Sequence, residues 1–528
     1  MINPELLIVG AGPTGLTLAN LLAKVGVDFM IIDSKEKPTQ DSKAFGIHAR
    51  SLEIFSQLGI AEELIAEGNI DNTFHIMSKA QEVASFKINN ILPGETPYPY
   101  FLILPQHKTE RRLVEALNTQ GHQVHWQHQL IDLTLKNQTY AAEIMDTQGE
   151  RHHISPKYII GCDGADSTVR KKAGISFNGT SFTSPFYLAD VELDSHLKHG
   201  DVYFTIAPNH LSVIFSYKRQ DHFRVFNFIK STINKKKHEK LLETEVQKIL
   251  DDNSSLKSKV ISKQWSSVYN IHCRMAESFV KGNVILAGDA AHVHSPVGGQ
   301  GMNTGIQDSF NLAWKLKWAI KNTQSSELVN SYQVERYPVA RNLHYSTDKF
   351  FQLLIKQNKI IDLIRIYFFP YVFRLLSNEF VLKFLFRRVS QIGIKYRKSP
   401  LNKNHSTSWI SLSPHQGDRA PWVPITYRGK KVDLYELLDY RYFTLLLAGT
   451  TTDYNAIINL LKEINQYRIP SIKVYYFPAS NNQAFYNTYD VKRAAMYLIR
   501  PDGHIGLKCN RIDNKVLERY LKDILLIT

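Results

Sequence analysis

A chain of 528 residues is too long for one compact core, so we expect two to four domains. Its hydrophobic content of 43% and charged content of 21% are typical of an ordinary soluble globular protein. Lys and Arg exceed Asp and Glu by 15, but they are dispersed in short runs, which favours a solvated surface and argues against a nucleic-acid partner.

The cysteines and the apolar runs exclude several further classes. Cys162, Cys273 and Cys509 form no CxxC pair and no metal-ligand spacing, so we expect reduced thiols, no metal site and a cytoplasmic location. The N-terminus enters a strand pattern without a signal peptide. The sequence has no run of about 18 uncharged apolar residues, which argues against a transmembrane segment.

A dinucleotide-binding pattern opens the chain. An apolar strand at residues 5–9 is followed by a glycine loop, a helix, and a second strand at 27–32 that ends at an acidic residue. The first two glycines permit a turn and a close pyrophosphate approach, the third lets the helix meet the strand, and the acid can accept from a ribose hydroxyl. The pattern predicts an FAD or NAD site at Gly10, Gly12, Pro13, Thr14, Gly15, Asp33 and Ser34.

Two later segments offer further polar contacts. Lys43 and Arg50 lie where a loop leads into a helix and are candidates for phosphate contacts, the alternative being a solvated loop and helix start. A strand at 158–162 ends at Asp163, which could accept from a ribityl or ribose hydroxyl. Ser167 is a suitable N-cap for the helix that carries Arg170, so a capped turn with a surface arginine is the alternative there.

The middle of the chain alternates like β-strands at about 74–104 and 176–266, with a charged helix predicted at 235–252. Aromatic residues are dense in the second region and could wall an aromatic substrate, although plain core is the interpretation that we favour.

A second glycine-rich stretch, at 282–320, has the pattern strand, glycine loop, helix start. Backbone N–H groups and the helix dipole would favour a phosphate or an anionic ring in front of the loop. The alternative is a tight β–α crossover.

Residues 346–395 then read as helical, aromatic and basic, which favours an interdomain or dimer-forming helix over a membrane-surface helix. From about 418, strands alternate with helices, which suggests a small α/β domain.

Three motifs together, GAGPTG with Asp33, CDGADSTVR, and AGDAAHVHSPVGGQGMNTGIQD, resemble the class A FAD-dependent aromatic hydroxylases. The similarity is greatest to the phenol hydroxylase and polyketide hydroxylase subgroup, whose late RPDG is echoed at 500–503. The resemblance implies an α/β and α+β fold: a Rossmann-like FAD-binding domain (1–75, 104–175 and 267–345), an inserted mixed β-sheet substrate domain (76–103 and 176–266), a helical linker (346–399) and a thioredoxin-like domain (400–528).

The resemblance also implies site residues. Beyond the first glycine loop, the FAD contacts would come from Lys43, Arg50, Gln106, Asp163, Arg170, Gly288, Asp289, Pro296, Gly299, Gln300, Gly301, Met302 and Asn303. Asp33 and Lys43 replace the Glu and Arg that are common in the family; both keep the charge but shorten the reach or lose the bidentate fork.

The implied reaction is hydroxylation of a phenolic or polyketide-like ring with NADPH or NADH and dioxygen, through a flavin hydroperoxide. Forming a phenolate near pH 7 requires a pKa shift of about three units, so we expect a basic or hydrogen-bonding partner. The candidates are His48, Tyr217 and Arg274, together with Pro296 against the ring. The alternatives are oxidation of a non-phenolic enol or antibiotic-like compound, and a basic surface-binding flavoprotein. A halogenase is disfavoured because no Trp-x-Trp occurs. A homodimer is the expected assembly.

Overall fold

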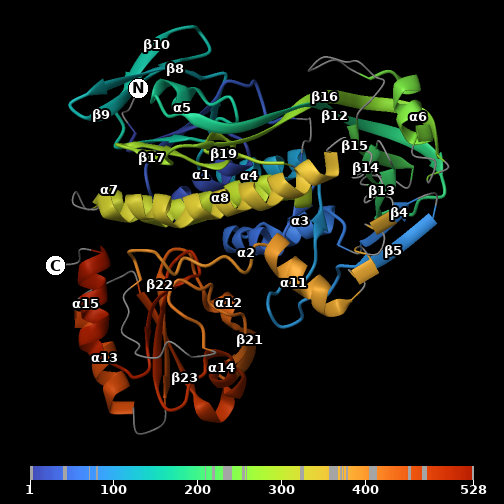
Figure 1. Ribbon diagram of the computed structural model, residues 1–528. Coiled ribbons are helices and arrows are strands. Elements are labelled where there is room, and N and C mark those ends of the chain that lie inside the picture. Colours follow the sequence, from blue (N-terminus) through green and yellow to red (C-terminus); the bar gives the residue numbers. More distant parts are fainter. Residues whose placement is uncertain are drawn as a thin grey trace.

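The computed structural model describes residues 4–39, 44–70, 72–78, 81–207, 210–216, 221–229, 241–252, 256, 258–295, 297–321, 326–355, 367–368, 372, 374–375, 378–402, 413–449, 454–466 and 472–525. Within these residues the chain forms a mixed α/β structure, as predicted. Figure 1 shows a long sheet at the upper right, helices crossing the centre, and a separate α/β unit below them.

The central unit is built on a six-stranded sheet with the order β17-β18-β11-β1-β2-β7. The neighbours from β18 to β7 are parallel, and β17 is antiparallel to β18. The inner strands are continuous apolar runs because both faces are covered. The strands are β1 (Leu6–Val9), β2 (Phe29–Asp33), β7 (Val124–Trp126), β11 (Tyr158–Gly161), β17 (Val280–Lys281) and β18 (Val284–Leu286).

Helices and short strands surround this sheet. The helices are α1 (Pro13–Lys24), α2 (Ala49–Leu58), α3 (Ala61–Glu67), α4 (Gln106–Thr119), α5 (Thr168–Lys172), α7 (Gly301–Lys321) and α8 (Ser326–Ile355). The short elements are β3 (Gly46–Ile47), β6 (Leu102–Ile103), β8 (Gln129–Lys136), β9 (Thr139–Met145), β10 (Arg151–Ile154), η1 (Gly288–Ala290), β19 (His292–Val293) and η2 (Val297–Gly299).

The second sheet has eight strands in the order β19-β16-β12-β15-β14-β13-β4-β5. Its strands are β4 (Thr73–Ser78), β5 (Gln81–Lys87), β12 (Phe177–Ser195), β13 (Val202–Ala207), β14 (His210–Ser216), β15 (His222–Ile229) and β16 (Ser258–Ala276). The charged helix α6 (Glu243–Asp252) packs on one face, and residues 235–240 of its predicted range lie outside the described part. The predicted boundary between residues 75 and 76 falls inside β4. The domain boundaries given above stay predictions.

Period-two alternation divides the aromatic residues of this sheet between its two faces. Tyr187, Tyr203 and Phe223 pack with α6 in one cluster of buried residues. Val202 and Phe215, with the partly buried Phe204 and Phe226, pack with Phe45 and Phe74 in another. The first face is plain core, as we favoured. The second faces the central unit, so the prediction of an aromatic wall applies only to that face.

The C-terminal unit has a four-stranded sheet in the order β23-β22-β24-β25, with β22 and β23 parallel and the other pairs antiparallel. The α/β prediction for this unit is confirmed, but β25 and α14 were not anticipated, and the thioredoxin-like name stays a prediction. Its elements are β20 (Pro424–Tyr427), β21 (Lys430–Asp433), α12 (Leu434–Leu437), β22 (Phe443–Gly449), α13 (Tyr454–Gln466), β23 (Ile472–Pro478), η5 (Ala479–Asn481), α14 (Gln483–Tyr489), β24 (Ala495–Ile499), β25 (Ile505–Cys509) and α15 (Asn514–Leu525).

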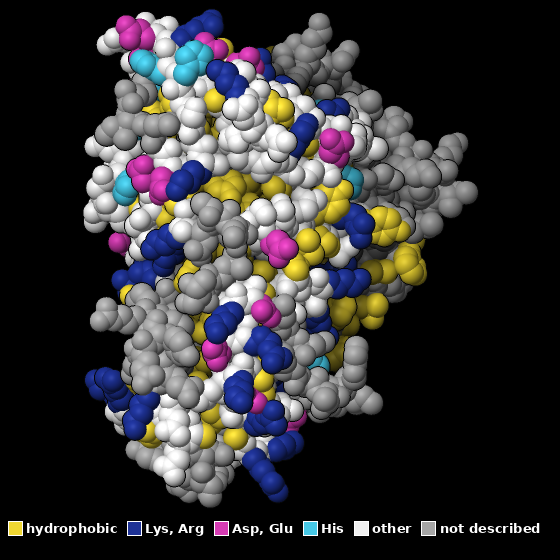
Figure 2. Space-filling view, turned by 90° about the vertical axis from the view of Figure 1, so that its left-hand side faces the viewer, with side chains coloured by type: hydrophobic (Ala, Val, Ile, Leu, Met, Phe, Trp, Pro, Cys, Tyr) yellow, Lys and Arg dark blue, Asp and Glu magenta, His cyan; other side chains and the backbone are white. Residues whose placement is uncertain are grey.

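Helix α11 (Glu379–Val389) precedes the C-terminal unit and follows the long α8. In the described part of the chain, no helix combines the length and apolar character needed to cross a bilayer. The three cysteines are free and buried. On the face shown in Figure 2, basic side chains are dispersed, with many toward the bottom, where the C-terminal unit lies. This arrangement agrees with a solvated basic surface.

Candidate active site

The loops that follow four adjacent parallel strands emerge at one edge of the six-stranded sheet. Gly10 follows β1, Asp33 ends β2, Asp163 follows β11, and Gly288 follows β18. These strands are neighbours in the order β18-β11-β1-β2. Ligands of open α/β sheets bind outside the carboxyl ends of the strands, so this edge is the expected nucleotide site.

The three glycines of the first loop have different roles. A Cβ on Gly10 would lie 2.4 Å from the carbonyl oxygen of Cys162, and one on Gly15 would lie 1.9 Å from the carbonyl oxygen of Gly10. A Cβ on Gly12, in contrast, would meet no protein atom within 4 Å. Gly10 and Gly15 are therefore required for packing, whereas Gly12 leaves an open side on which a ligand can approach the backbone.

Asp33 braces this loop. Its carboxylate accepts hydrogen bonds from the backbone N–H of Ala11 at 2.7 Å and of Lys35 at 2.9 Å. Each carboxylate oxygen has a second lone-pair direction, so a ribose hydroxyl can still donate to the group. Ser34 follows it and is exposed.

The second glycine stretch packs directly on the first. Thr14, in the first turn of α1, would be 2.5 Å from a Cβ on Gly288 and 2.2 Å from one on Gly305. The hydroxyl of Ser309 on α7 donates to the carbonyl oxygen of Thr14 at 2.8 Å. The starts of α1 and α7 are thereby held side by side, and Asp289, next to Gly288 on η1, is exposed.

Asn303 connects the second glycine loop to β3 and α2. Its side-chain oxygen accepts from the backbone N–H of His48, and its amide donates to the carbonyl oxygens of Gly46 and Gly299. Gly298 and Gly299 both have left-handed φ values, of 78° and 61°, and are exposed, which glycine tolerates best. Gln300 is buried, and Gly301 and Met302 form the half-buried first turn of α7.

This arrangement fits FAD. The N-cap of α1 makes no side-chain hydrogen bond, and neither α1 nor α7 has an acidic residue in its first turn. Each helix start therefore presents backbone N–H groups and a partial positive charge without a competing carboxylate. The open side of Gly12 fits a pyrophosphate, and the start of α7 suits a ring that becomes anionic on reduction.

Two predicted cofactor residues also serve the fold. The carboxylate of Asp163 accepts from the Ser167 hydroxyl and from the backbone N–H groups of Thr168 and Val169, so it caps α5. Arg170 donates to the carbonyl oxygens of Ala290 at 2.9 Å and Ala165 at 2.8 Å. Ser167 is the predicted N-cap of α5, and its side chain accepts from the backbone N–H of Arg170. Arg170 is buried and tethers η1, and thus the segment that carries Asp289, instead of lying on the surface.

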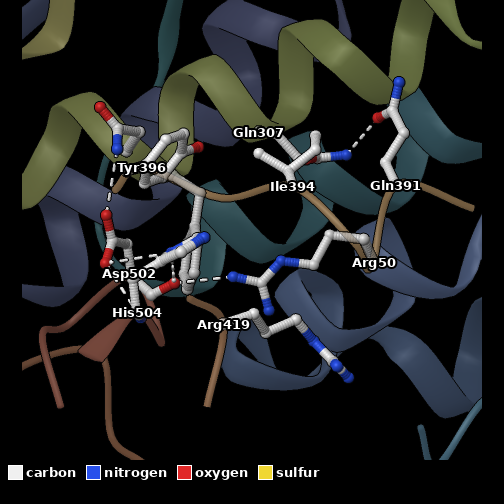
Figure 3. A pocket seen from close by; sticks show the side chains of 10 residues that line it. Arg50, Gln307, Gln391, Ile394, Tyr396, Arg419, Asp502 and His504 are labelled. Carbon is white, nitrogen blue, oxygen red and sulfur yellow. Dashed lines mark hydrogen bonds and ion pairs between the residues drawn. The ribbon is translucent and has the colours of Figure 1, made fainter. Parts of the chain in front are cut away.

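Arg50 points toward the C-terminal unit. Its guanidinium donates to Glu53 at 2.8 Å and to the backbone carbonyl oxygen of Asp502 at 2.7 Å, beside a small pocket that His504 and Arg419 also line (Figure 3). These bonds engage the guanidinium within the protein, so the predicted FAD contact of Arg50 is not favoured. Gln106 starts α4 and donates to Glu110 at 2.8 Å.

A buried ion cluster lies beneath the two glycine stretches and was not anticipated. Asp308 accepts from the backbone N–H of Gly288 at 3.0 Å, from Arg336 at 2.6 Å, and contacts His292 at 2.8 Å. Arg336 also donates to the carbonyl oxygen of Thr304 at 3.2 Å. The cluster thus fixes η1 to the first turns of α7. The aspartate ends the GIQD motif, but its partner on α8 follows only from the tertiary structure.

His48 lies between the glycine loop and the aromatic face of the second sheet. Its Nε2 is 2.9 Å from the carbonyl oxygen of Gly298, which requires the proton on Nε2, and its buried Nδ1 has no hydrogen-bond partner. Its ring centroid is 4.9 Å from that of Phe101, which in turn is 6.2 Å from that of Phe74. Phe101 was missed by sequence reasoning because it lies in a segment of irregular structure.

The remaining predicted residues are elsewhere or not described. Lys43, Tyr217 and Pro296 lie outside the described residues. Arg274 is on β16, where its guanidinium donates to the hydroxyl of Ser181 at 2.7 Å near the surface. The structure therefore brings together the two glycine stretches, Asp33 and His48, and of the candidate partners for a phenol it favours His48.

His48 gives a testable pH dependence. Burial lowers its pKa from 6.5 to about 4, although hydrogen bonds to the loop carbonyls oppose this. As the pH falls from 6.5 toward 4, His48 takes up a proton in the unfolded chain but not in the folded chain. The contribution of His48 to the free energy of unfolding is therefore complete above pH 6.5 and is lost across that window. We expect the share of His48 in this loss to be roughly 2 kcal/mol between about pH 7.5 and about pH 5.

Urea unfolding of the wild type and of His48→Gln at the two pH values measures this share. Glutamine keeps a donor for Gly298 but does not titrate, so the variant should lose less stability on acidification. Equal losses in both proteins would show that folded His48 takes up the proton.

Comparisons with known proteins agree with this site. Residues 4–347 match the model of a family described as an FAD binding domain. The chain is 30% identical to an uncharacterized aromatic compound monooxygenase of Bacillus subtilis, over 98% of each chain. It is 31% identical to pentachlorophenol 4-monooxygenase of Sphingobium chlorophenolicum, over 89% of this chain and 85% of that protein.

Solved structures show the same fold. The flavin-dependent monooxygenase PieE, solved with FAD and substrate, superposes with a TM-score of 0.81 at 21% identity over the whole of both chains. An anhydrotetracycline hydroxylase of Streptomyces rimosus superposes with a TM-score of 0.78 at 24% identity over 99% of each chain.

Proposed function

The chain belongs to the family defined by this FAD-binding domain and is an FAD-dependent aromatic monooxygenase, and we propose that it hydroxylates a phenolic or polyketide-like ring with NAD(P)H and dioxygen. When bound, FAD supplies the redox chemistry, passing electrons from the nicotinamide to dioxygen so that one oxygen atom enters the ring and the other leaves as water. The work of the protein is to bind and orient both partners.

The cofactor would be held by the two glycine stretches. The start of α1, with Gly12, would bind the pyrophosphate, and the carboxylate of Asp33 would accept a hydrogen bond from a ribose hydroxyl. Asp289 and Gly298 to Asn303 would hold the ribityl chain and the ring. The start of α7 would stabilise the reduced, anionic ring by roughly 0.3–2 kcal/mol through its dipole, and direct N–H bonds would add to this.

The observation that supports an aromatic substrate is the position of His48 and Phe101. Both contact the second glycine stretch: His48 bonds Gly298, and a Cβ on Gly299 would lie 4.0 Å from Phe101. Beyond Phe101 lies the aromatic face of the second sheet. An aromatic ring stacked in this layer would lie beside the loop that is proposed to hold the flavin ring.

We assign His48 the role of accepting a hydrogen bond from the phenol hydroxyl at its unpartnered Nδ1, which orients the ring and polarises its O–H bond. A phenol has a pKa of about 10, so removing its proton near pH 7 needs a nearby acceptor. Burial lowers the pKa of the imidazole to about 4, so near pH 7 the ring is neutral and Nδ1 is free to accept a hydrogen bond, although it is too weak a base to hold the proton itself.

His48→Gln should retain FAD and slow coupled hydroxylation by about 10²-fold, because glutamine preserves the bond to Gly298 but lacks the ring nitrogen that orients and polarises the phenol. Product formed per NAD(P)H oxidised, measured together with flavin content, checks this. His153→Gln, at an exposed position on β10, is the control and should form product like the wild type. Unchanged product formation in His48→Gln would refute the assignment.

The overall proposal is tested with purified protein. It should be yellow, oxidise NAD(P)H slowly alone, and oxidise it faster with a suitable ring while forming a hydroxylated product. A panel of phenols, polyketide-like rings and non-phenolic enols would identify the substrate class. Protein that stays colourless after incubation with FAD would contradict the proposal.

We also propose a cytoplasmic, dimeric protein. Three buried, free cysteines favour a reducing compartment. The choice between NADPH and NADH follows from a comparison of their oxidation rates, and light scattering measures the assembly.

A further inference from the structure

Helix α11 has an apolar outer face. Its first turn is fixed by Asn378, whose side chain accepts from the backbone N–H groups of Phe380 and Val381. Phe386 packs into the main core. On the opposite side, Phe380 is 80% exposed and Phe384, one turn later, is 58% exposed. Both sides of the helix are therefore apolar, but only one is covered within the chain.

Other exposed apolar residues lie just before α11, namely Phe368, Val372 and Leu375. Large exposed apolar patches on soluble proteins are a feature of interaction sites. We name Phe368, Val372, Leu375, Phe380 and Phe384 the aromatic patch.

The patch is set among basic residues. Residues 367–388 contain four Lys or Arg and one acidic residue, and Arg374 and Arg388 are exposed. Arg387 already pairs with Glu95, and Lys383 with Glu379. Arg388 lies one turn after Phe384 on α11, and Arg374 adds positive charge to the preceding segment, on a chain whose net charge is +15.

We propose that the aromatic patch binds an anionic lipid surface, with Phe380 and Phe384 entering the interface between headgroups and acyl chains. Aromatic side chains beside Lys and Arg are the combination by which interfacial helices bind anionic bilayers. A second copy of this chain is disfavoured as the occupant, because two such patches would bring like charges together.

The test is co-sedimentation of the FAD-loaded enzyme with vesicles of phosphatidylglycerol and phosphatidylcholine in equal parts, and with vesicles of phosphatidylcholine alone. We expect binding to the anionic vesicles that weakens at high salt. Phe380→Ser/Phe384→Ser should lower the partition coefficient by about tenfold or more. The matched control is Leu135→Ser/Ile261→Ser, which changes two exposed apolar residues on strands β8 and β16, away from α11. This variant should bind like the wild type.

Flavin content and melting temperature show that each variant is folded, so a loss of binding reports on the surface alone. Equal partitioning of the two double variants, equal binding to both kinds of vesicle, or no binding to either would overturn the proposal. Patch-dependent self-association in light scattering without vesicle binding would also overturn it and assign the face to a second copy.

Discussion

Gly12→Ala is expected to weaken FAD binding by about 100-fold, or roughly 3 kcal/mol, without changing the stability of the apoprotein. The added methyl group would meet no protein atom within 4 Å. The φ angle of Gly12 is −80°, which alanine adopts without strain. The only clash would be with a phosphate that approaches the backbone, so the loss reports on the cofactor contact itself.

Titration of apoprotein with FAD, followed by flavin fluorescence, measures the Kd, and thermal unfolding without FAD measures the fold. Gly15→Ala should reduce both, since its Cβ would lie 1.9 Å from the carbonyl oxygen of Gly10. Gly393→Ala, with its nearest contact at an ordinary 3.6 Å, should change neither. If Gly12→Ala binds FAD as tightly as the wild type, the pyrophosphate does not bind at this loop.

The parts of the site that were predictable follow from local rules. Each glycine loop is flanked by a strand and a helix that periodicity alone indicates, and a parallel sheet places the ends of such strands at one edge. The same reasoning placed strands within 74–104 and 176–266, because alternation marks a half-buried strand, although β16 runs on to Ala276 beyond the predicted range.

The parts that were not predictable depend on distant contacts. Arg50 fits a phosphate contact by position, yet its partners are Glu53 and a carbonyl oxygen 452 positions away. Phe101 lies in a loop without periodicity, so only its contact with His48 identifies it. Asp163 was expected at a ribose hydroxyl because it ends a strand, but capping of α5 uses the same carboxylate.

The role of the C-terminal unit rests on a buried ion cluster that joins it to α7 and α8. Glu335 on α8 accepts from Arg500 at 2.6 Å and 2.9 Å and from Lys315 of α7 at 2.7 Å. All three side chains are fully buried. Asp502 completes the cluster by accepting from Asn311 of α7 at 3.0 Å. The RPDG motif is therefore a docking element that supports the helix whose start faces the proposed flavin ring.

Glu335→Ala is expected to destabilise the protein by about 3–5 kcal/mol, because it leaves two buried cations sharing one carboxylate. Urea and thermal unfolding near neutral pH measure the change. Glu327→Ala, on the exposed first turn of the same helix, is the matched control and should lie within about 0.5 kcal/mol of the wild type. A Glu335→Ala protein as stable as the control would mean that the cluster does not hold the units together.

The pH dependence of this effect separates lost charge from lost packing. Burial alone would raise the pKa of Glu335, but Arg500 and Lys315 lower it from 4.5 to about 2. The ionised carboxylate therefore contributes its stability above pH 4.5, and this contribution is lost as the pH falls through about 2. The difference between the wild type and Glu335→Gln, which keeps the side-chain volume, should be constant above 4.5 and shrink below it. A difference that persists unchanged in acid would assign the effect to packing and hydrogen bonds, because glutamine and a protonated carboxyl group carry the same charge.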